Sequence, residues 1–163
     1  MKLLTWLGSW VALVTTGIVM LVLAVRGRVG WFAVLFAIVA WGGETAAVQL
    51  AKHVVQRARP PERIWLKTAH GWSWPSGHMA VAVVVFIVLA LIVTHLFPTS
   101  PVRASAWALA VIAIAAVGFS RIELGVHWST DVMASLVFVS LWLLAIVTLF
   151  RKELSDAGRR DPM

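Results

Sequence analysis

The feature that most constrains this chain is a series of five long apolar stretches separated by short polar segments. A helix needs roughly 20 mostly apolar residues to cross ~30 Å of hydrocarbon, and each stretch is close to that length. The stretches cover residues 3–25, 29–55, 78–97, 102–119 and 130–150. The sequence therefore predicts an all-α, integral-membrane bundle of about five transmembrane helices. The first stretch is too long for the apolar region of a signal peptide and lacks a clear cleavage site, so we expect it to be a spanning helix.

Composition agrees with a membrane protein. Hydrophobic residues make up 61% of the 163 residues and charged residues 13%, whereas about a quarter of a soluble domain is charged. A chain of this size is expected to form a single membrane-embedded domain, residues 1–163, with a basic tail at 151–163. The net charge of +7 arises from loops and tails, which fits anionic lipid headgroups better than nucleic acid. The absence of cysteine excludes thiolate metal sites.

The distribution of basic residues predicts an orientation. Five crossings put the long loop 57–77 and the turn near residues 120–130 on the same membrane face as the N-terminus. Each face carries seven Lys and Arg residues, but three on the loop side are expected to hold a ligand, which leaves four against seven. The positive-inside rule then places the C-terminal tail in the cytoplasm. We therefore expect a multi-pass protein of the cell (inner) membrane with its active site on the extracytoplasmic face.

Polar residues next to the apolar stretches are concentrated in three short segments. The second stretch ends in "KHVVQRARP", which supplies Lys52, Arg59 and Pro60, a residue expected to end the helix. The third stretch follows "WPSGH", in which Ser76 is expected to cap the helix and Gly77 to let a ligand approach the backbone. The alternation of crossings brings both segments to one membrane face.

The third segment, "SRIELGVHWSTD", lies between the last two stretches on that same face. It contains Ser120, Arg121, His127 and Asp131. The histidine and the aspartate are four residues apart, so they share one side of a helical turn. A carboxylate that accepts Nδ1–H fixes the imidazole tautomer and leaves Nε2 as a nucleophile. A second histidine, His78, is then available as the general acid for the leaving oxygen.

The basic residues suit a tetrahedral phosphate dianion. Arg59 and Arg121 can each form two hydrogen bonds to phosphate oxygens, and Lys52 adds a point charge. The first amides of the helix that begins near residues 76–78 complete an anion site. Because these cations neutralise the developing charge, we expect no metal and no cofactor.

Together the three segments resemble the motifs of the type 2 phosphatidic acid phosphatase superfamily: Lys-x6-Arg-Pro, Pro-Ser-Gly-His and Ser-Arg-x5-His-x3-Asp. The match covers residues 52–131 with order and spacing intact. The resemblance implies a phosphohistidine intermediate on His127 and acid–base catalysis by His78. The residues that it implies for phosphate binding are Lys52, Arg59, Ser76, Gly77, Ser120 and Arg121. Membrane members usually have six spanning helices, one more than the apolar stretches found here, and the missing helix would precede the motifs.

The sequence thus predicts a phosphoric ester or diphosphate hydrolase that acts on a membrane lipid without a metal. Polyprenyl (undecaprenyl) diphosphate is slightly favoured as substrate over phosphatidylglycerophosphate or phosphatidate. Lipid phosphotransfer and non-catalytic binding of anionic lipid remain as alternatives. The expected partners are the lipid phosphate and the bilayer, with no nucleic acid, and no oligomeric state is predicted. A vanadate-dependent peroxidase is disfavoured, because those relatives are soluble.

Other residues leave alternatives open. Trp72 and Trp74, in the long loop, belong either to an interfacial aromatic belt or to a lid over the lipid headgroup. Glu123, inside the third segment, either pairs with a loop arginine or repels a substrate charge. For Glu44 we favour an inter-helix hydrogen bond, with Gly42 and Gly43 allowing close packing, over a functional role.

Overall fold

The computed structural model describes residues 6–157 and is all-α in this part. Its elements are α2 (Trp10–Val25), α3 (Trp31–Val55), the short 3-10 helix η1 (Glu62–Ile64), α4 (Gly77–Leu96), α5 (Ser100–Glu123) and α6 (Ser129–Ala157). The predicted fold class is confirmed. Four helices, α3 to α6, are long and apolar enough to cross a membrane, whereas α2, with 16 residues, is shorter.

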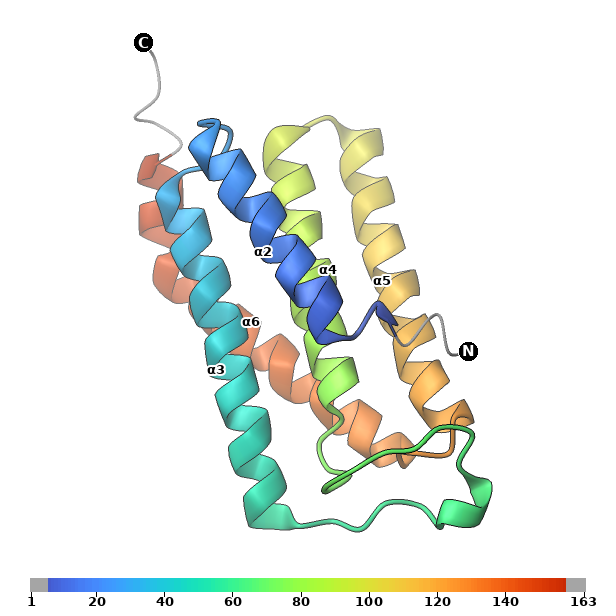
Figure 1. Ribbon diagram of the computed structural model, residues 1–163. Coiled ribbons are helices and arrows are strands. Elements are labelled where there is room, and N and C mark those ends of the chain that lie inside the picture. The colour runs from blue at the N-terminus through green and yellow to red at the C-terminus, as the bar shows by residue number, and fades with distance from the viewer. Residues whose placement is uncertain (1–5, 158–163) are drawn as a thin grey trace.

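The first helix is shorter than predicted. Residues 3–5 lie outside the described part, and a turn precedes α2, which begins only at Trp10. In this turn Gly8 packs so closely against the backbone carbonyl of His78 and the side chain of Val117 that a Cβ would overlap both. Since only glycine permits this approach, the segment lies against α4 and α5 instead of continuing as a helix. As a result, α2 starts midway along the bundle (Figure 1).

The residue that ends α3 also differs from the predicted one. The helix ends at Val55, and Gln56 adopts the left-handed conformation with φ 49°. The backbone N–H of Gln56 still bonds to the carbonyl of Lys52, at 3.0 Å. Gln56, not Pro60, therefore terminates the helix, and residues 57–60 form a non-helical segment beneath the bundle.

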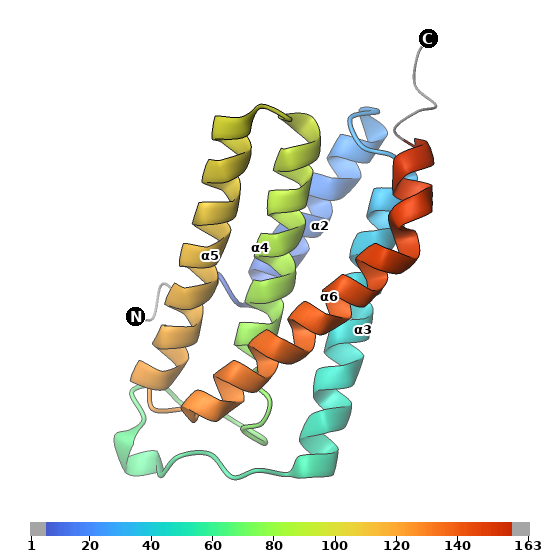
Figure 2. The same cartoon turned by 180° about the vertical axis from the view of Figure 1, so that it is seen from behind.

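Helix α4 occupies the centre of the bundle. It contacts α2, α3, α5 and α6, and α6 crosses obliquely over α3 and α4 (Figure 2). The buried face of α4 is made of small and β-branched side chains, among them Ala80, Val83, Val84 and Val88. Small residues let membrane helices approach closely. This packing fixes the end of α3, the starts of α4 and α6, the end of α5 and the loop of residues 56–76 at one end of the molecule (Figure 1).

Candidate active site

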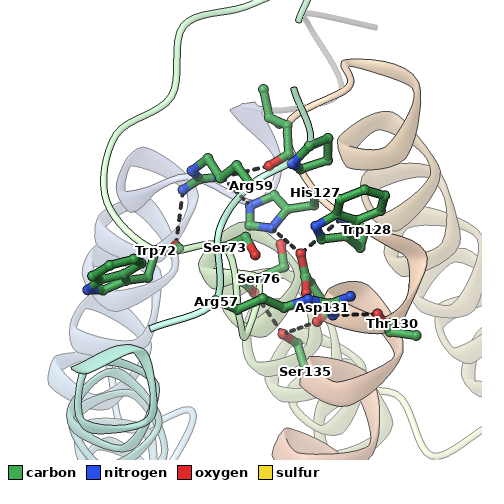
Figure 3. Close-up of polar contacts among 12 residues, drawn as sticks. Arg57, Arg59, Trp72, Ser73, Ser76, His127, Trp128, Thr130, Asp131 and Ser135 are labelled. Atoms are coloured by element: carbon green, nitrogen blue, oxygen red, sulfur yellow. Dashed lines mark hydrogen bonds and ion pairs between the residues drawn. The ribbon is translucent and has the colours of Figure 1, made fainter. Parts of the chain in front are cut away.

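The loop that follows α3 is fixed by hydrogen bonds at the lower end of the bundle. The carbonyl of Arg57 accepts from the backbone N–H of Ser73 at 2.9 Å. The carbonyl of Ala58 accepts from Ser73 Oγ at 3.0 Å and from Trp128 Nε1 at 3.1 Å. These bonds join the start and the end of the loop to the segment before α6. They orient Arg57 and Arg59, two residues apart, toward the same group of side chains (Figure 3).

His127 and Asp131 form the predicted pair. His127 lies just before α6, and Asp131 lies in the first turn of that helix. Both side chains are buried, and His127 Nδ1 is 3.4 Å from Asp131 Oδ2 (Figure 3). The same carboxylate oxygen accepts from the backbone N–H of Trp128 at 2.9 Å. The aspartate therefore caps the start of α6 and orients the imidazole at the same time.

The other ring nitrogen identifies the tautomer. His127 Nε2 is 3.2 Å from Arg59 Nη1. A guanidinium group only donates hydrogen bonds, so Nε2 must be the acceptor and carry no proton. The proton then resides on Nδ1, facing Asp131. This is the tautomer that leaves a lone pair on Nε2 for attack on an electrophile.

Burial keeps the His127 imidazole neutral. It lowers the pKa of His127 from its usual value of 6.5 to about 4. The hydrogen bond to Asp131 opposes this shift, whereas the cations Arg59 and Arg121 reinforce it. The ring is therefore an uncharged nucleophile at neutral pH.

Arg57 is a site residue that was not predicted from the sequence, where it counts only as one of the basic residues on that membrane face. Arg57 Nη1 donates to Asp131 Oδ1 at 2.8 Å and to Thr130 Oγ1 at 2.6 Å. Its guanidinium also lies 5.6 Å from the centre of the Trp128 ring. The sequence "RAR" could have indicated this role, because two arginines that are two residues apart in a non-helical segment can point to the same side. Arg57 thus fixes the position of the Asp131 carboxylate, which in turn orients the His127 imidazole.

The basic side chains converge on carbonyl oxygens of the loop. Lys52 Nζ donates to the carbonyl of Trp72 at 2.7 Å. Arg59 donates from Nε to the carbonyl of Gly71 at 2.9 Å and from Nη2 to that of His70 at 2.9 Å. Arg59 Nη2 also lies 3.3 Å from the carbonyl oxygen of Trp72, so Lys52 and Arg59 share this one acceptor. Two cations that converge on one oxygen beside His127 are suited to binding a phosphate.

The start of α4 provides open space and a buried hydroxyl. Ser76 is the N-cap residue, but its hydroxyl makes no capping hydrogen bond, contrary to prediction, and this buried Oγ finds no partner in the described part. Its backbone N–H donates to the carbonyl of Asp131 at 3.2 Å, and its carbonyl accepts from Ser135 Oγ at 3.0 Å. A Cβ on Gly77 would meet no atom within 4 Å. Half-buried His78 follows directly in the first turn of the helix.

The last turn of α5 carries three further predicted site residues. Arg121 is buried, and its charge contributes to the lowered pKa of His127. Ser120 is also buried, and its hydroxyl donates to the carbonyl of Val117 at 2.7 Å, so it faces its own helix. Glu123 is exposed and forms no ion pair among the described side chains, so pairing with a loop arginine, one of its two suggested roles, is not found there.

The remaining candidates lie around this centre. Trp72 contributes its backbone carbonyl and is 38% exposed as a whole residue, and Trp74 is half-buried. Glu44 is buried inside α3 and accepts a hydrogen bond from Thr45 at 3.2 Å, a contact within its own helix. Among the described side chains, no three His, Asp or Glu residues group as metal ligands.

The sequence and the fold are similar to those of known proteins. Residues 29–155 match the family model described as the PAP2 superfamily. Over 107 residues, which are 65% of this chain and 52% of the relative, the sequence is 33% identical to phosphatidylglycerophosphatase B of Bacillus subtilis (strain 168). The chain thus spans about half the length of that curated relative. The fold matches the crystal structure of a transmembrane PAP2-type phosphatidylglycerolphosphate phosphatase from Bacillus subtilis with a TM-score of 0.76 and 25% identity, covering 93% of this chain and 75% of that chain.

Proposed function

The chain belongs to the PAP2 superfamily, and from this premise we propose that it removes a phosphate group from a membrane lipid through a phosphohistidine on His127. One observation carries this proposal: the imidazole is buried between Asp131, on Nδ1, and Arg59, beside Nε2. This arrangement supplies a neutral nucleophile, an acid that orients it, and a cation where the phosphoryl oxygens come to lie.

In the first step, the substrate phosphate enters between Arg59 and Nε2, and Nε2 attacks phosphorus. Lys52, Arg59 and Arg121 stabilise the charge on the equatorial oxygens. The bond from phosphorus to the lipid oxygen breaks. His78, which enters this step as an imidazolium ion paired with the negatively charged substrate phosphate, gives its proton to that oxygen, so the lipid leaves as an alcohol or a monophosphate. The ring of His127 becomes positively charged, and Asp131 stabilises it.

In the second step, a water molecule hydrolyses the phosphoenzyme. The now neutral His78 takes a proton from water, and the oxygen attacks phosphorus as the bond to Nε2 breaks. Inorganic phosphate leaves, and both histidines return to their starting states. Every proton and bond is accounted for by two histidines, without a metal ion.

We propose a glycerophospholipid monoester, phosphatidylglycerophosphate, as the substrate. Its support is that both relatives carry this activity in their names. The polyprenyl diphosphate favoured from the sequence has no such support. A substrate panel on purified protein in detergent distinguishes them: phosphatidylglycerophosphate, phosphatidate, polyprenyl mono- and diphosphates and a soluble phosphomonoester. Highest kcat/KM on the polyprenyl compounds would overturn this assignment but leave the mechanism intact.

The test of the mechanism is His127→Ala with His53→Ala as the matched control, since His53 is exposed on the last turn of α3. We expect the first variant to lose at least ~10³-fold in kcat, as nucleophile removal does elsewhere, and the second to retain activity. Rapid quenching with ³²P-labelled substrate should trap label on wild type only. Undiminished turnover by His127→Ala would refute the mechanism.

Two further measurements address the alternatives. Vanadate, which mimics a trigonal-bipyramidal phosphorus, should inhibit, while millimolar EDTA should not. An excess of acceptor lipid should leave the yield of free phosphate unchanged. Transfer of the label to that acceptor would indicate a phosphotransferase, and binding without turnover of any substrate would indicate a non-catalytic lipid-binding protein.

A further inference from the structure

A cavity of about 360 Å³ lies at the end of the bundle opposite the active site. It is formed by α2, α3, α4, α6 and the turn between α2 and α3, which is at the top in Figure 1. Its walls include Met20, Phe36, Val88 and Ile92 and, at its outer end, Arg28 and His95. The cavity is distinct from the catalytic centre, because fourteen residues of α4 separate His78 from Ile92, about 21 Å along the helix axis.

The two ends of this cavity differ in chemistry. Met20, Phe36 and Val88 come from three different helices, are at most 5% exposed, and form an apolar inner part. Arg28 and His95 are exposed at the outer end. Among the described residues that line the cavity none is acidic, so this part of the wall does not neutralise Arg28.

The position of the cavity relative to the membrane matches this division. Helix α3 begins at Trp31, which is 62% exposed, and α4 ends at Leu96. An exposed tryptophan at a helix end is typical of the membrane interface. Arg28 and His95, next to these helix ends, therefore lie at headgroup level, and Val88 lies about 10 Å deeper along α4.

We propose that this cavity binds an anionic phospholipid from the leaflet opposite the active site. The phosphate lies against Arg28 with His95 beside it, and part of one acyl chain fills the space between the helices. Basic pockets between transmembrane helices bind anionic headgroups, and the volume is in the ~300–1,000 Å³ range of ligand sites. Charge complementarity selects this occupant: a zwitterionic lipid carries an ammonium group beside its phosphate and brings no net counter-charge to Arg28, whereas an anionic headgroup does.

Such a ligand connects α2 to the rest of the bundle. The cavity wall combines Met20 from α2 with residues of α3, α4 and α6, and α2 is the shortest of these helices. A lipid that binds only the folded state stabilises it by mass action. The bound phospholipid is therefore expected to raise the melting temperature without being a substrate.

The test uses the purified full-length protein, delipidated in detergent, with dioleoyl phosphatidylserine and dioleoyl phosphatidylcholine as probes. Neither lipid carries a terminal phosphate monoester. We expect phosphatidylserine to raise Tm more than phosphatidylcholine and to remain bound in native mass spectrometry. Arg28→Gln should weaken the affinity for phosphatidylserine about fivefold, as expected for one basic residue. The same stabilisation should persist in His127→Ala, which separates this site from the catalytic one.

Two variants keep the result interpretable. Arg103→Gln is the matched control, because Arg103 is an exposed cation near the start of α5 that does not line the cavity. It should leave phosphatidylserine binding unchanged. Ala33→Leu adds volume inside the cavity and should reduce lipid binding while phosphatase activity persists.

Three outcomes would overturn the proposal. The first is an equal effect of both lipids, which would indicate acyl chains alone. The second is an equal loss in Arg28→Gln and Arg103→Gln, which would indicate general surface charge. The third is a lipid-free dimer that Ala33→Leu dissociates, which would indicate that a second copy of the chain covers this face.

Discussion

Asp131 is the most constrained side chain of the catalytic centre. It is fully buried, and its two oxygens bind Arg57 on one side and both His127 and the backbone N–H of Trp128 on the other. A buried carboxylate is stable only when its hydrogen bonds are satisfied. The orientation of the nucleophile consequently depends on a residue, Arg57, that is expected to touch no substrate atom.

Replacing Arg57 by glutamine tests this dependence. Without the cation, the carboxylate loses an ion pair, and the imidazole loses a fixed orientation. We expect kcat to fall about 10–100-fold, the scale of a small misplacement of a catalytic group, with KM much less affected. Arg57→Lys should restore part of kcat, and Arg63→Gln, which changes an exposed loop cation, should have no effect. A rise in KM at constant kcat would instead assign Arg57 to substrate binding.

The pKa of His127 gives a second prediction at this scale. Because burial lowers that pKa to about 4, the ring stays neutral as the pH falls from 7 to 5 and is protonated only near pH 4. ¹⁵N NMR of histidine-labelled protein without substrate should show this, with His127→Ala identifying the resonance among five histidines. A midpoint near the usual 6.5 would contradict the described burial.

At the scale of the elements, apolar length predicted that the helices exist, but side-chain contacts decide where they end. The first predicted helix is interrupted because Gly8 packs on the carbonyl of His78, and α3 ends at Gln56 instead of Pro60. Neither contact leaves a periodic signal in the sequence. The bond between Arg57 and Asp131 joins residues that are 74 positions apart, and Arg57 lies in an irregular loop. This pairing could therefore not be predicted from the sequence either.

Two adjacent glycines in α3 provide a matched pair. A Cβ on Gly43 would overlap the Trp142 ring, whose Nε1 donates to the carbonyl of Ala40 at 3.2 Å, whereas a Cβ on Gly42 would meet nothing. Gly43→Ala should destabilise the fold by ~1–3 kcal/mol, the usual penalty of overpacking. Gly42→Ala should be neutral or stabilising by up to ~1 kcal/mol, because alanine favours the helix. Thermal unfolding in detergent checks both, and equal shifts would contradict this α3–α6 contact.

At the scale of the whole molecule, the sequence predicted the convergence of the three motif segments, and the packing of α4 explains it. Order and spacing of polar residues at helix ends were enough to place them on one face. What the motifs omitted was the supporting layer. It consists of the hydroxyls of Ser73 and Ser135, which donate to backbone carbonyls, and of the carbonyl groups of residues 70–72, which accept from Lys52 and Arg59. Backbone contacts can be made by many residue types and leave little trace in sequence.

Membrane orientation is testable because the chain contains no cysteine. Thr68→Cys, on the active-site side, should react with an impermeant maleimide in intact cells. Thr99→Cys, in the turn before α5 at the other end, should react only after permeabilisation. This pattern is expected because the positive-inside rule predicts that the basic C-terminal tail lies in the cytoplasm. The reverse labelling pattern would put the site on the cytoplasmic face.

The carbonyl groups at residues 70–72 have a consequence for turnover. They supply Lys52 and Arg59 with uncharged hydrogen-bond acceptors. A ligand that displaces these carbonyl groups therefore binds favourably only if it offers the two cations a formal negative charge. A phosphate dianion makes that exchange favourable, whereas the released alcohol offers no more than the protein already does. Inorganic phosphate should therefore be the stronger product inhibitor, and the dephosphorylated lipid should diffuse away into the bilayer.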